Sequence, residues 1–259
     1  MNTSALDLSI LWPALAAGLL VTMTHVPLGM QVLSRGIVFI DLAIAQIAGL
    51  GVIFADFIGL EPQGWAVQAF ALLAALAGAL LLTWTDKRWP EVQEAVIGVS
   101  FVLAASGALL LVASNAHGGE HLKDLLVGQI LWVSPAKLGM VALVYAGLSA
   151  IWFFRGGDVG RIGFYMLFAC AVTISVQLVG LYLVFTTLIV PALATRSVAR
   201  CRVVIGYALS AAGYALGLVL STLTDLPSGP SIVWVMTILA MIAFAAFARG
   251  KSTTKGTPT

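Results

Sequence analysis

The chain has 259 residues, of which 61% are hydrophobic and 9% are charged, and its net charge is +2. Soluble domains are about 45–50% apolar and about 25% charged, so this composition excludes a soluble globular protein. Nothing in it supports nucleic-acid binding. The sequence therefore predicts an all-α, polytopic protein embedded in the lipid bilayer.

Nine apolar stretches are candidates for membrane-spanning helices, each of which needs about 20 apolar residues. They lie at residues 9–33, 37–58, 65–85, 95–115, 136–154, 162–179, 181–195, 203–223 and 230–248. The two that meet at Gly180 could merge, so the prediction is a helical bundle of about eight to nine transmembrane helices. We expect one membrane domain over residues 1–250 and a disordered cytoplasmic tail over residues 251–259.

Lysine and arginine residues decide the expected orientation, because they are retained on the cytoplasmic side of a membrane. With nine spans and a cytoplasmic C-terminus, eleven of the thirteen basic residues fall inside the cell. These are Arg35, Lys87, Arg88, Arg155, Arg161, Arg196, Arg200, Arg202, Arg249, Lys251 and Lys255, whereas Lys123 and Lys137 fall outside. The N-terminus is therefore predicted outside, although eight spans would place it inside.

Three polar residues, His25, Asp41 and Gln46, fall inside the first two predicted helices. His25 and Gln46 are ten and eleven residues from Arg35, which places both roughly 15 Å from the cytoplasmic end at about 1.5 Å per residue. Imidazole and carboxylate groups suit a divalent metal, with the Gln46 carbonyl as a weaker ligand. The group could line a cation pathway, or His25 and Gln46 could form a structural hydrogen bond between adjacent helices.

A predicted outer loop carries three further metal-binding residue types, His117, Glu120 and His121. Their spacing matches the H-x-x-E-H protease pattern, but that pattern needs a helix and Gly118 with Gly119 argues against one. Two interpretations stay open, namely weak metal capture and a solvated loop.

The apolar stretch 181–195 contains Pro191, which removes a backbone hydrogen bond that hydrocarbon cannot replace. We therefore expect this segment to be packed inside other helices rather than exposed to lipid. Arg196, Arg200 and Arg202 follow it on the cytoplasmic side. They could form a solvated basic loop or a surface on which a partner docks.

Five stretches spread over most of the chain carry a resemblance to a known family. Residues 35–51 read R-G-I-V-F-I-D-L-A-I-A-Q-I-A-G-L-G, and residues 179–196 read V-G-L-Y-L-V-F-T-T-L-I-V-P-A-L-A-T-R. Residues 94–101, 124–131 and 225–230 read E-A-V-I-G-V-S-F, D-L-L-V-G-Q-I-L and D-L-P-S-G-P. In this order they resemble the membrane subunit of ATP-binding-cassette (ABC) metal importers, the family that includes zinc and manganese uptake permeases.

The resemblance implies a permease subunit of the type II importer kind in the inner (plasma) membrane, not itself an enzyme and without a bound cofactor. It implies a homodimer that docks ATPase subunits, with an extracytoplasmic substrate-binding protein delivering the cargo. The expected cargo is a divalent metal ion of the zinc or manganese class, or a metal chelate. ATP would be used by the partner, because the chain lacks a Gly-x-x-x-x-Gly-Lys-Ser/Thr phosphate loop.

The resemblance also suggests a role for the arginine-rich stretch. Residues 192–203 are expected to form a coupling helix that lies in a groove of the ATPase. The residues expected to make this contact are Thr195, Arg196, Val198, Arg200 and Arg202.

The chain departs from the family pattern at the intramembrane ligands. The family's Asp and His would fall at Leu42 and Gln46, whereas Asp41 is displaced by one residue, about 100° around a helix. His25 has no counterpart in the matched segment. The sequence therefore indicates a divergent branch, and two other classes stay open: a secondary transporter driven by an ion gradient, and an intramembrane enzyme or assembly factor.

Overall fold

The computed structural model describes residues 8–60, 64–112, 130–155, 160–198 and 200–253. Within these ranges the chain forms nine α-helices, two short 3-10 helices and no strand. The α-helices are α1 (Leu8–Arg35), α2 (Ile40–Phe57), α3 (Trp65–Arg88), α4 (Gln93–Val112), α6 (Pro135–Phe154), α7 (Gly160–Val179), α8 (Leu181–Ala194), α9 (Arg202–Thr224) and α10 (Ser228–Thr253). The 3-10 helices are η2 (Pro90–Val92) and η3 (Ile130–Trp132).

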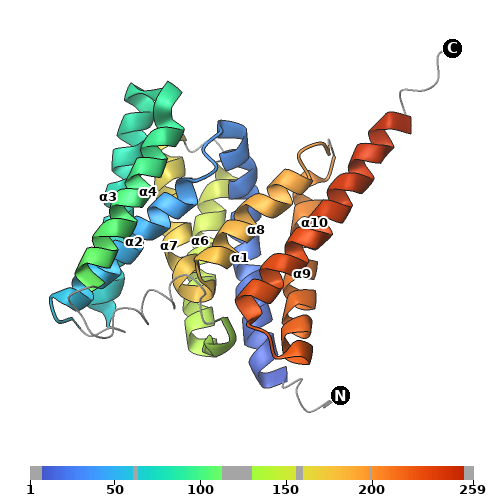
Figure 1. Cartoon of the computed structure of the whole chain (residues 1–259), viewed down its shortest axis with the longest axis horizontal. Coiled ribbons are helices and arrows are strands. Elements are labelled where there is room, and N and C mark those ends of the chain that lie inside the picture. The colour runs from blue at the N-terminus through green and yellow to red at the C-terminus, as the bar shows by residue number, and fades with distance from the viewer. Residues whose placement is uncertain (1–7, 61–63, 113–129, 156–159, 199, 254–259) are drawn as a thin grey trace.

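Each α-helix coincides with one of the nine apolar stretches, so the prediction of an all-α helical bundle is confirmed. Seven of the helices are long and apolar enough to cross a membrane, whereas α8 and the apolar part of α4 (Val96–Ala105) are shorter. The beginning of α1 and the end of α10 lie at opposite ends of the bundle (Figure 1), as an odd number of traverses requires.

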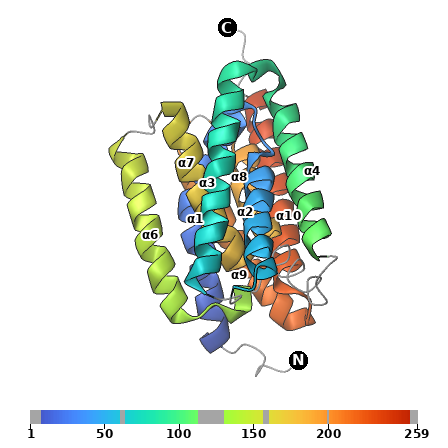
Figure 2. The same cartoon turned by 90° about the vertical axis from the view of Figure 1, so that its left-hand side faces the viewer.

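The helices form two groups joined by α7. In one group α2 packs against both α3 and α4, and in the other α8 and α9 each pack against both α1 and α10. Helix α7 contacts members of both groups, and α6 lies at the margin beside α1 and α7 (Figure 2). The bundle is therefore not built in simple chain order.

Helix α8 lies at the centre of this arrangement and contacts α1, α2, α7, α9 and α10. Ten of its fourteen residues are buried, Pro191 among them, which confirms that the proline-containing segment is packed inside other helices. Only Gly180 separates it from α7, and this residue has φ +87°, a conformation that side chains other than glycine rarely adopt. Glycine thus permits the abrupt reversal from α7 into α8.

Small residues let the helix backbones touch. A Cβ atom added at Gly29 of α1 would lie 1.8 Å from the carbonyl oxygen of Leu188 in α8. On α9, a Cβ at Gly213 or Gly217 would lie 2.7 Å from Met236 Cβ or 2.5 Å from Ile232 Cα of α10. Such close approach is the usual way for helices to associate in lipid, where apolar burial gives little driving force.

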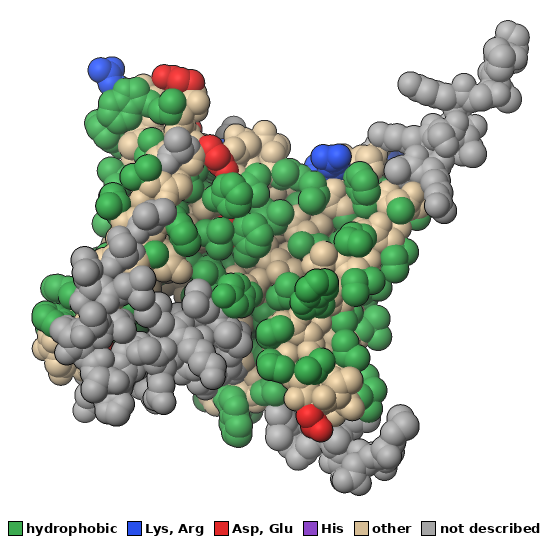
Figure 3. All heavy atoms as spheres, in the orientation of Figure 1, with side chains coloured by type: hydrophobic (Ala, Val, Ile, Leu, Met, Phe, Trp, Pro, Cys, Tyr) green, Lys and Arg blue, Asp and Glu red, His purple; other side chains and the backbone are tan. Residues whose placement is uncertain are grey.

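The outer surface is apolar over most of its area. Figure 3 shows hydrophobic side chains over most of one face, with charged side chains towards its two ends. Phe154 and Leu143, for example, are 92% and 78% exposed, which would be unfavourable in water over so wide a patch. This surface suits contact with hydrocarbon.

The α1–α8 contact predicts a large effect of substitution at Gly29. Gly29→Leu would place a side chain against the Leu188 backbone, and overpacking of this kind costs about 1–3 kcal/mol or more. We expect a clearly lower thermal unfolding midpoint for the protein in detergent.

Gly147→Leu on α6 is the matched control, because no atom lies within 4 Å of a Cβ at that position. We expect its midpoint to stay close to that of the native chain. Equal loss of stability in the two variants would contradict the direct contact between α1 and α8.

Candidate functional site: buried polar residues and the α8–α9 turn

His25 is fully buried in α1, where its own helix holds the ring. Its Nδ1 lies 2.9 Å from Oγ1 of Thr24 and 3.1 Å from the carbonyl oxygen of Val21. Because the Thr24 hydroxyl donates to the same carbonyl, it can only accept from the ring, which places the proton of a neutral imidazole on Nδ1. Nε2 then carries the free lone pair, and it has no hydrogen-bond partner among the described residues. This is the form of histidine that binds metals.

Asp41 is fully buried in the first turn of α2. Neither of its carboxylate oxygens has a hydrogen-bond partner within the described part of the chain. Burying a carboxylate without a partner is costly, so an intramembrane aspartate of this kind is a candidate functional residue.

The structure does not bring His25 and Gln46 together. The expectation that the first two helices pack side by side is wrong, because within the described residues α1 packs on α8 and α9 while α2 packs on α3 and α4. Helices α7 and α8 contact both and lie between them. His25 accordingly bonds within α1, and a His25–Gln46 hydrogen bond is not formed.

Leu42 and Gln46, where the family's ligand pair would fall, are both half-buried. They lie about 100–140° around α2 from Asp41 at 100° per residue. The one-residue displacement of the carboxylate therefore turns it into the protein's own interior, away from the face that carries positions 42 and 46. Whether His25, Asp41 and Gln46 line a pathway stays a prediction.

The segment between α8 and α9 differs from expectation. A single helix over residues 192–203 was expected, but α8 ends at Ala194, a turn follows, and α9 begins at Arg202. The Thr195 hydroxyl donates to the Pro191 carbonyl (2.7 Å), and Cys201 has φ +58°, outside the helical region. We call the described residues between the two helices, 195–198 and 200–201, the α8–α9 turn.

The residues predicted to contact an ATPase are placed differently from one another. Thr195 is fully buried and Val198 is half-buried, whereas Arg200 is exposed. The guanidinium of Arg196 lies 5.3 Å from the ring centroid of Phe244 in α10. That of Arg202 donates to the Ala192 carbonyl (3.1 Å) and so ties the start of α9 to the end of α8. Among these three arginines, Arg200 makes no such internal contact within the described residues.

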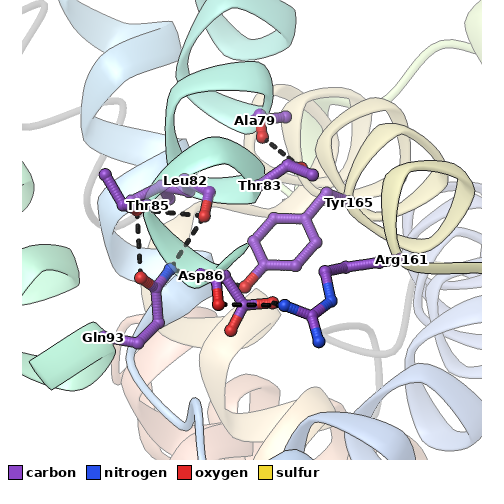
Figure 4. Close-up of polar contacts among 8 residues, drawn as sticks. All are labelled: Ala79, Leu82, Thr83, Thr85, Asp86, Gln93, Arg161 and Tyr165. Atoms are coloured by element: carbon purple, nitrogen blue, oxygen red, sulfur yellow. Dashed lines mark hydrogen bonds and ion pairs between the residues drawn. The ribbon is translucent and has the colours of Figure 1, made fainter. Parts of the chain in front are cut away.

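A polar cluster between α3, α4 and α7 was not predicted from the sequence (Figure 4). Nε2 of Gln93 donates to the Leu82 carbonyl (2.9 Å), and Oε1 accepts from the Thr85 hydroxyl (3.0 Å). The same nitrogen lies 3.4 Å from the Tyr165 hydroxyl of α7. Gln93 thus closes the hairpin of α3 and α4 and connects it to α7.

Two arginine side chains near this cluster join the ends of α1, α3 and α7. Arg161 of α7 lies 3.3 Å from the Asp86 carboxylate of α3 and also donates to the Asp86 carbonyl (2.9 Å). Arg35 of α1 lies over the ring of Phe164, 4.2 Å from its centroid. The structure therefore gathers Arg35 and Arg161 at one end of the bundle, as the predicted orientation requires.

Hydroxyl pairs across helices were also not foreseen. Thr22 of α1 and Ser210 of α9 are 2.9 Å apart, and Thr187 of α8 and the Tyr214 hydroxyl of α9 are 2.8 Å apart. Interhelical hydrogen bonds of this kind hold membrane bundles together. A polar residue at a small-residue face, such as Thr22 beside Gly18, is the sequence signal that could have indicated them.

The remaining predicted ligands, His117, Glu120 and His121, lie outside the described residues. Among the described residues, no three His, Cys, Asp or Glu side chains come together as a multidentate metal site would need.

Comparison with known proteins decides the family. The sequence profile of the ABC 3 transport family matches residues 7–156 and 158–247. The chain belongs to the ABC 3 transport family. The resemblance carried by the five sequence stretches is thereby confirmed, and the helical bundle described above is a membrane permease of this family.

Individual relatives of this ABC 3 family chain are distant but match along its length. It is 24% identical to the high-affinity zinc uptake system membrane protein ZnuB of Haemophilus influenzae, over 86% of this chain and 92% of that protein. It is 27% identical to the manganese transport system membrane protein MntC of Halalkalibacterium halodurans, over 92% of this chain and 88% of that protein. The solved structure of PsaBC from Streptococcus pneumoniae in complex with Fab has the same fold, with a TM-score of 0.72 and 20% identity over 94% of this chain and 95% of that one.

The orientation of the bundle can be tested with single cysteines in a variant whose Cys170 and Cys201 are replaced by serine. Asp225 and Arg88 are both exposed, and they terminate α9 and α3 at opposite ends of the bundle. We expect Asp225→Cys to react with a membrane-impermeant maleimide in spheroplasts, and Arg88→Cys to react only after permeabilisation. The reverse pattern would overturn the predicted orientation.

Proposed function

We propose that this chain is the permease subunit of an ABC importer that moves a divalent metal ion, or a metal chelate, across the inner membrane. The observation that carries the proposal is the family match over almost the whole chain, together with relatives whose names specify zinc and manganese transport. ATP hydrolysis is assigned to a separate ATPase subunit.

The working assembly is proposed to contain two copies of this chain, ATPase subunits on the cytoplasmic side and an extracytoplasmic substrate-binding protein. The α8–α9 turn supports the ATPase contact, because it joins the buried α8 to α9 through the Arg202–Ala192 hydrogen bond while presenting Arg200 to solvent. A partner that binds the exposed cation can therefore act on the buried α8.

Within the protein, His25 and Asp41 are proposed to contact the cargo in turn rather than as one site. Both side chains are wholly inaccessible in this conformation and lie in different helix groups. A metal ion could reach them only when the helices move relative to one another, as a transporter that opens alternately to each side requires. Transient contact with few ligands also lets a pathway release what it binds.

Metal uptake in a cell strain lacking this chain tests the proposed function. Expression of the chain from a plasmid should restore growth in medium depleted of zinc or manganese and restore accumulation of the radioactive ion. Unchanged accumulation of both metals, with the protein present in the membrane, would contradict a role in metal import.

Substitutions at the two buried residues test the proposed pathway. His25→Ala and Asp41→Asn should each lower the initial rate of metal uptake by about tenfold or more, a loss that disturbing a metal site commonly causes. Ser149→Ala is the matched control, since Ser149 is another buried polar group without a partner among the described residues but is not a preferred metal ligand.

The protein level of each variant in the membrane must equal that of the native chain. Near-native uptake by both the His25 and the Asp41 variant would show that these groups are structural and would remove them from the pathway.

The α8–α9 turn yields a prediction about coupling. Val198→Asp would place a charge on the half-buried side chain of the turn, and we expect it to abolish the stimulation of the ATPase by the permease while leaving membrane insertion intact. The measurement is ATP hydrolysis by the reconstituted complex.

Val92→Asp, on the exposed connection between α3 and α4, is the control for adding a negative charge on another surface connection. Native stimulation in the Val198 variant, or equal loss in both, would contradict a specific role for the α8–α9 turn.

A further inference from the structure

Helix α1 contains a proline at a position where a backbone hydrogen bond is missing. Pro27 has no N–H, so the carbonyl of Met23, four residues earlier, receives no helical hydrogen bond from it. A carbonyl left without a partner inside a membrane is costly and is normally satisfied by a neighbouring helix. We call this missing bond the Pro27 gap.

A tyrosine from α9 fills the Pro27 gap. The hydroxyl of Tyr207 donates to the Met23 carbonyl oxygen at 3.1 Å. The preceding residue, Gly206, allows α9 to come this close, because a Cβ there would lie 2.8 Å from Val26 Cγ1 of α1. Two consecutive residues of α9 therefore contact α1 at Met23 and Val26, within the turn that ends at Pro27.

Two hollows flank the segment of α1 around the gap. A small cavity between α1, α6 and α7 is lined by Met23, Thr24 and Pro27, among others. A groove of about 610 Å³ between α1, α6 and α9 is lined by Thr22, Met23 and Tyr207, among others. Met23 lines both hollows and is 48% exposed, whereas the next three residues are buried, so its carbonyl is held less by packing and more by the hydrogen bond from Tyr207.

Tyr207 also lies close to the α8–α9 turn. It is five residues, less than two helical turns, after Arg202, whose guanidinium donates to the Ala192 carbonyl and closes that turn. The carbonyl that Tyr207 holds is only two residues before His25. If the α8–α9 turn is displaced and the start of α9 tilts with it, the part of α1 beside His25 would therefore move as well.

We propose that the Tyr207 hydroxyl is a positioning group that holds α1 at the Pro27 gap and links the α8–α9 turn to the part of α1 that carries His25. The link to transport rests on the function proposed above, whereas the positioning of α1 does not. Tyr207 differs from a tyrosine that only packs, because the effect of removing its hydroxyl must depend on Pro27.

A double-mutant cycle of Tyr207→Phe and Pro27→Ala tests this dependence. Alanine at position 27 restores the N–H, so the Met23 carbonyl regains a partner within α1 and no longer needs Tyr207. In the native background, Tyr207→Phe should raise the unfolding equilibrium constant about threefold, the value of an average interhelical hydrogen bond in a membrane protein, and so lower the thermal midpoint in detergent. It should also reduce the metal moved per ATP hydrolysed. In the Pro27→Ala background, the same substitution should change neither quantity.

Tyr182→Phe is the matched control, because Tyr182 is an exposed tyrosine of α8, and it should leave both readouts unchanged in both backgrounds. Equal effects of Tyr207→Phe with and without Pro27, or none in the native background, would overturn the positioning role. If Tyr207→Phe lowers stability only when Pro27 is present but leaves the metal moved per ATP unchanged, the link to the α8–α9 turn would be overturned.

A result that contradicts the proposed function can be told apart from one that contradicts the role of Tyr207. If the native chain with its ATPase moved no metal, the importer assignment would fall, and the stability cycle alone would decide whether Tyr207 holds α1 at the Pro27 gap.

Discussion

The direct contact between the backbones of α1 and α8 is the constraint on which the rest of the bundle depends. Because Gly29 has no side chain, α1 meets the Leu188 carbonyl, and α8 can occupy the centre of the bundle although it is only fourteen residues long. A central α8 separates α1 from α2 and brings α9 against α1, where Tyr207 reaches the Met23 carbonyl. The separated first pair and the bridged proline thus both follow from the central position of α8.

Apolar length and proline chemistry predicted the helices and the burial of α8, because both are properties of single segments. Which helices are neighbours could not be predicted in this way. In lipid, that choice depends on where small residues such as Gly29, Gly51 and Gly78 permit contact, which the hydropathy of a segment does not reveal. The separation of His25 from Gln46 and the non-helical α8–α9 turn therefore emerged only from the structure, whereas the family was already indicated by five short motifs.

The buried polar residues gain a physical interpretation from this arrangement. In a site open to solvent, a carboxylate and an imidazole would be hydrated, but Asp41 and His25 are sealed and lack partners on three of their polar atoms among the described residues. The cost of this state is tolerable if it is temporary, so a second conformation that exposes or pairs these groups is a natural counterpart.

ATP hydrolysis on a partner subunit is proposed to drive metal transport through this chain. The test uses proteoliposomes that contain the chain, its ATPase and its binding protein. Radioactive zinc or manganese is supplied on the side of the membrane where the binding protein lies. We expect accumulation that requires hydrolysable ATP on the ATPase side and that persists when proton and sodium gradients are collapsed. Accumulation driven by an ion gradient without ATP would show a secondary transporter and would exclude an ABC importer.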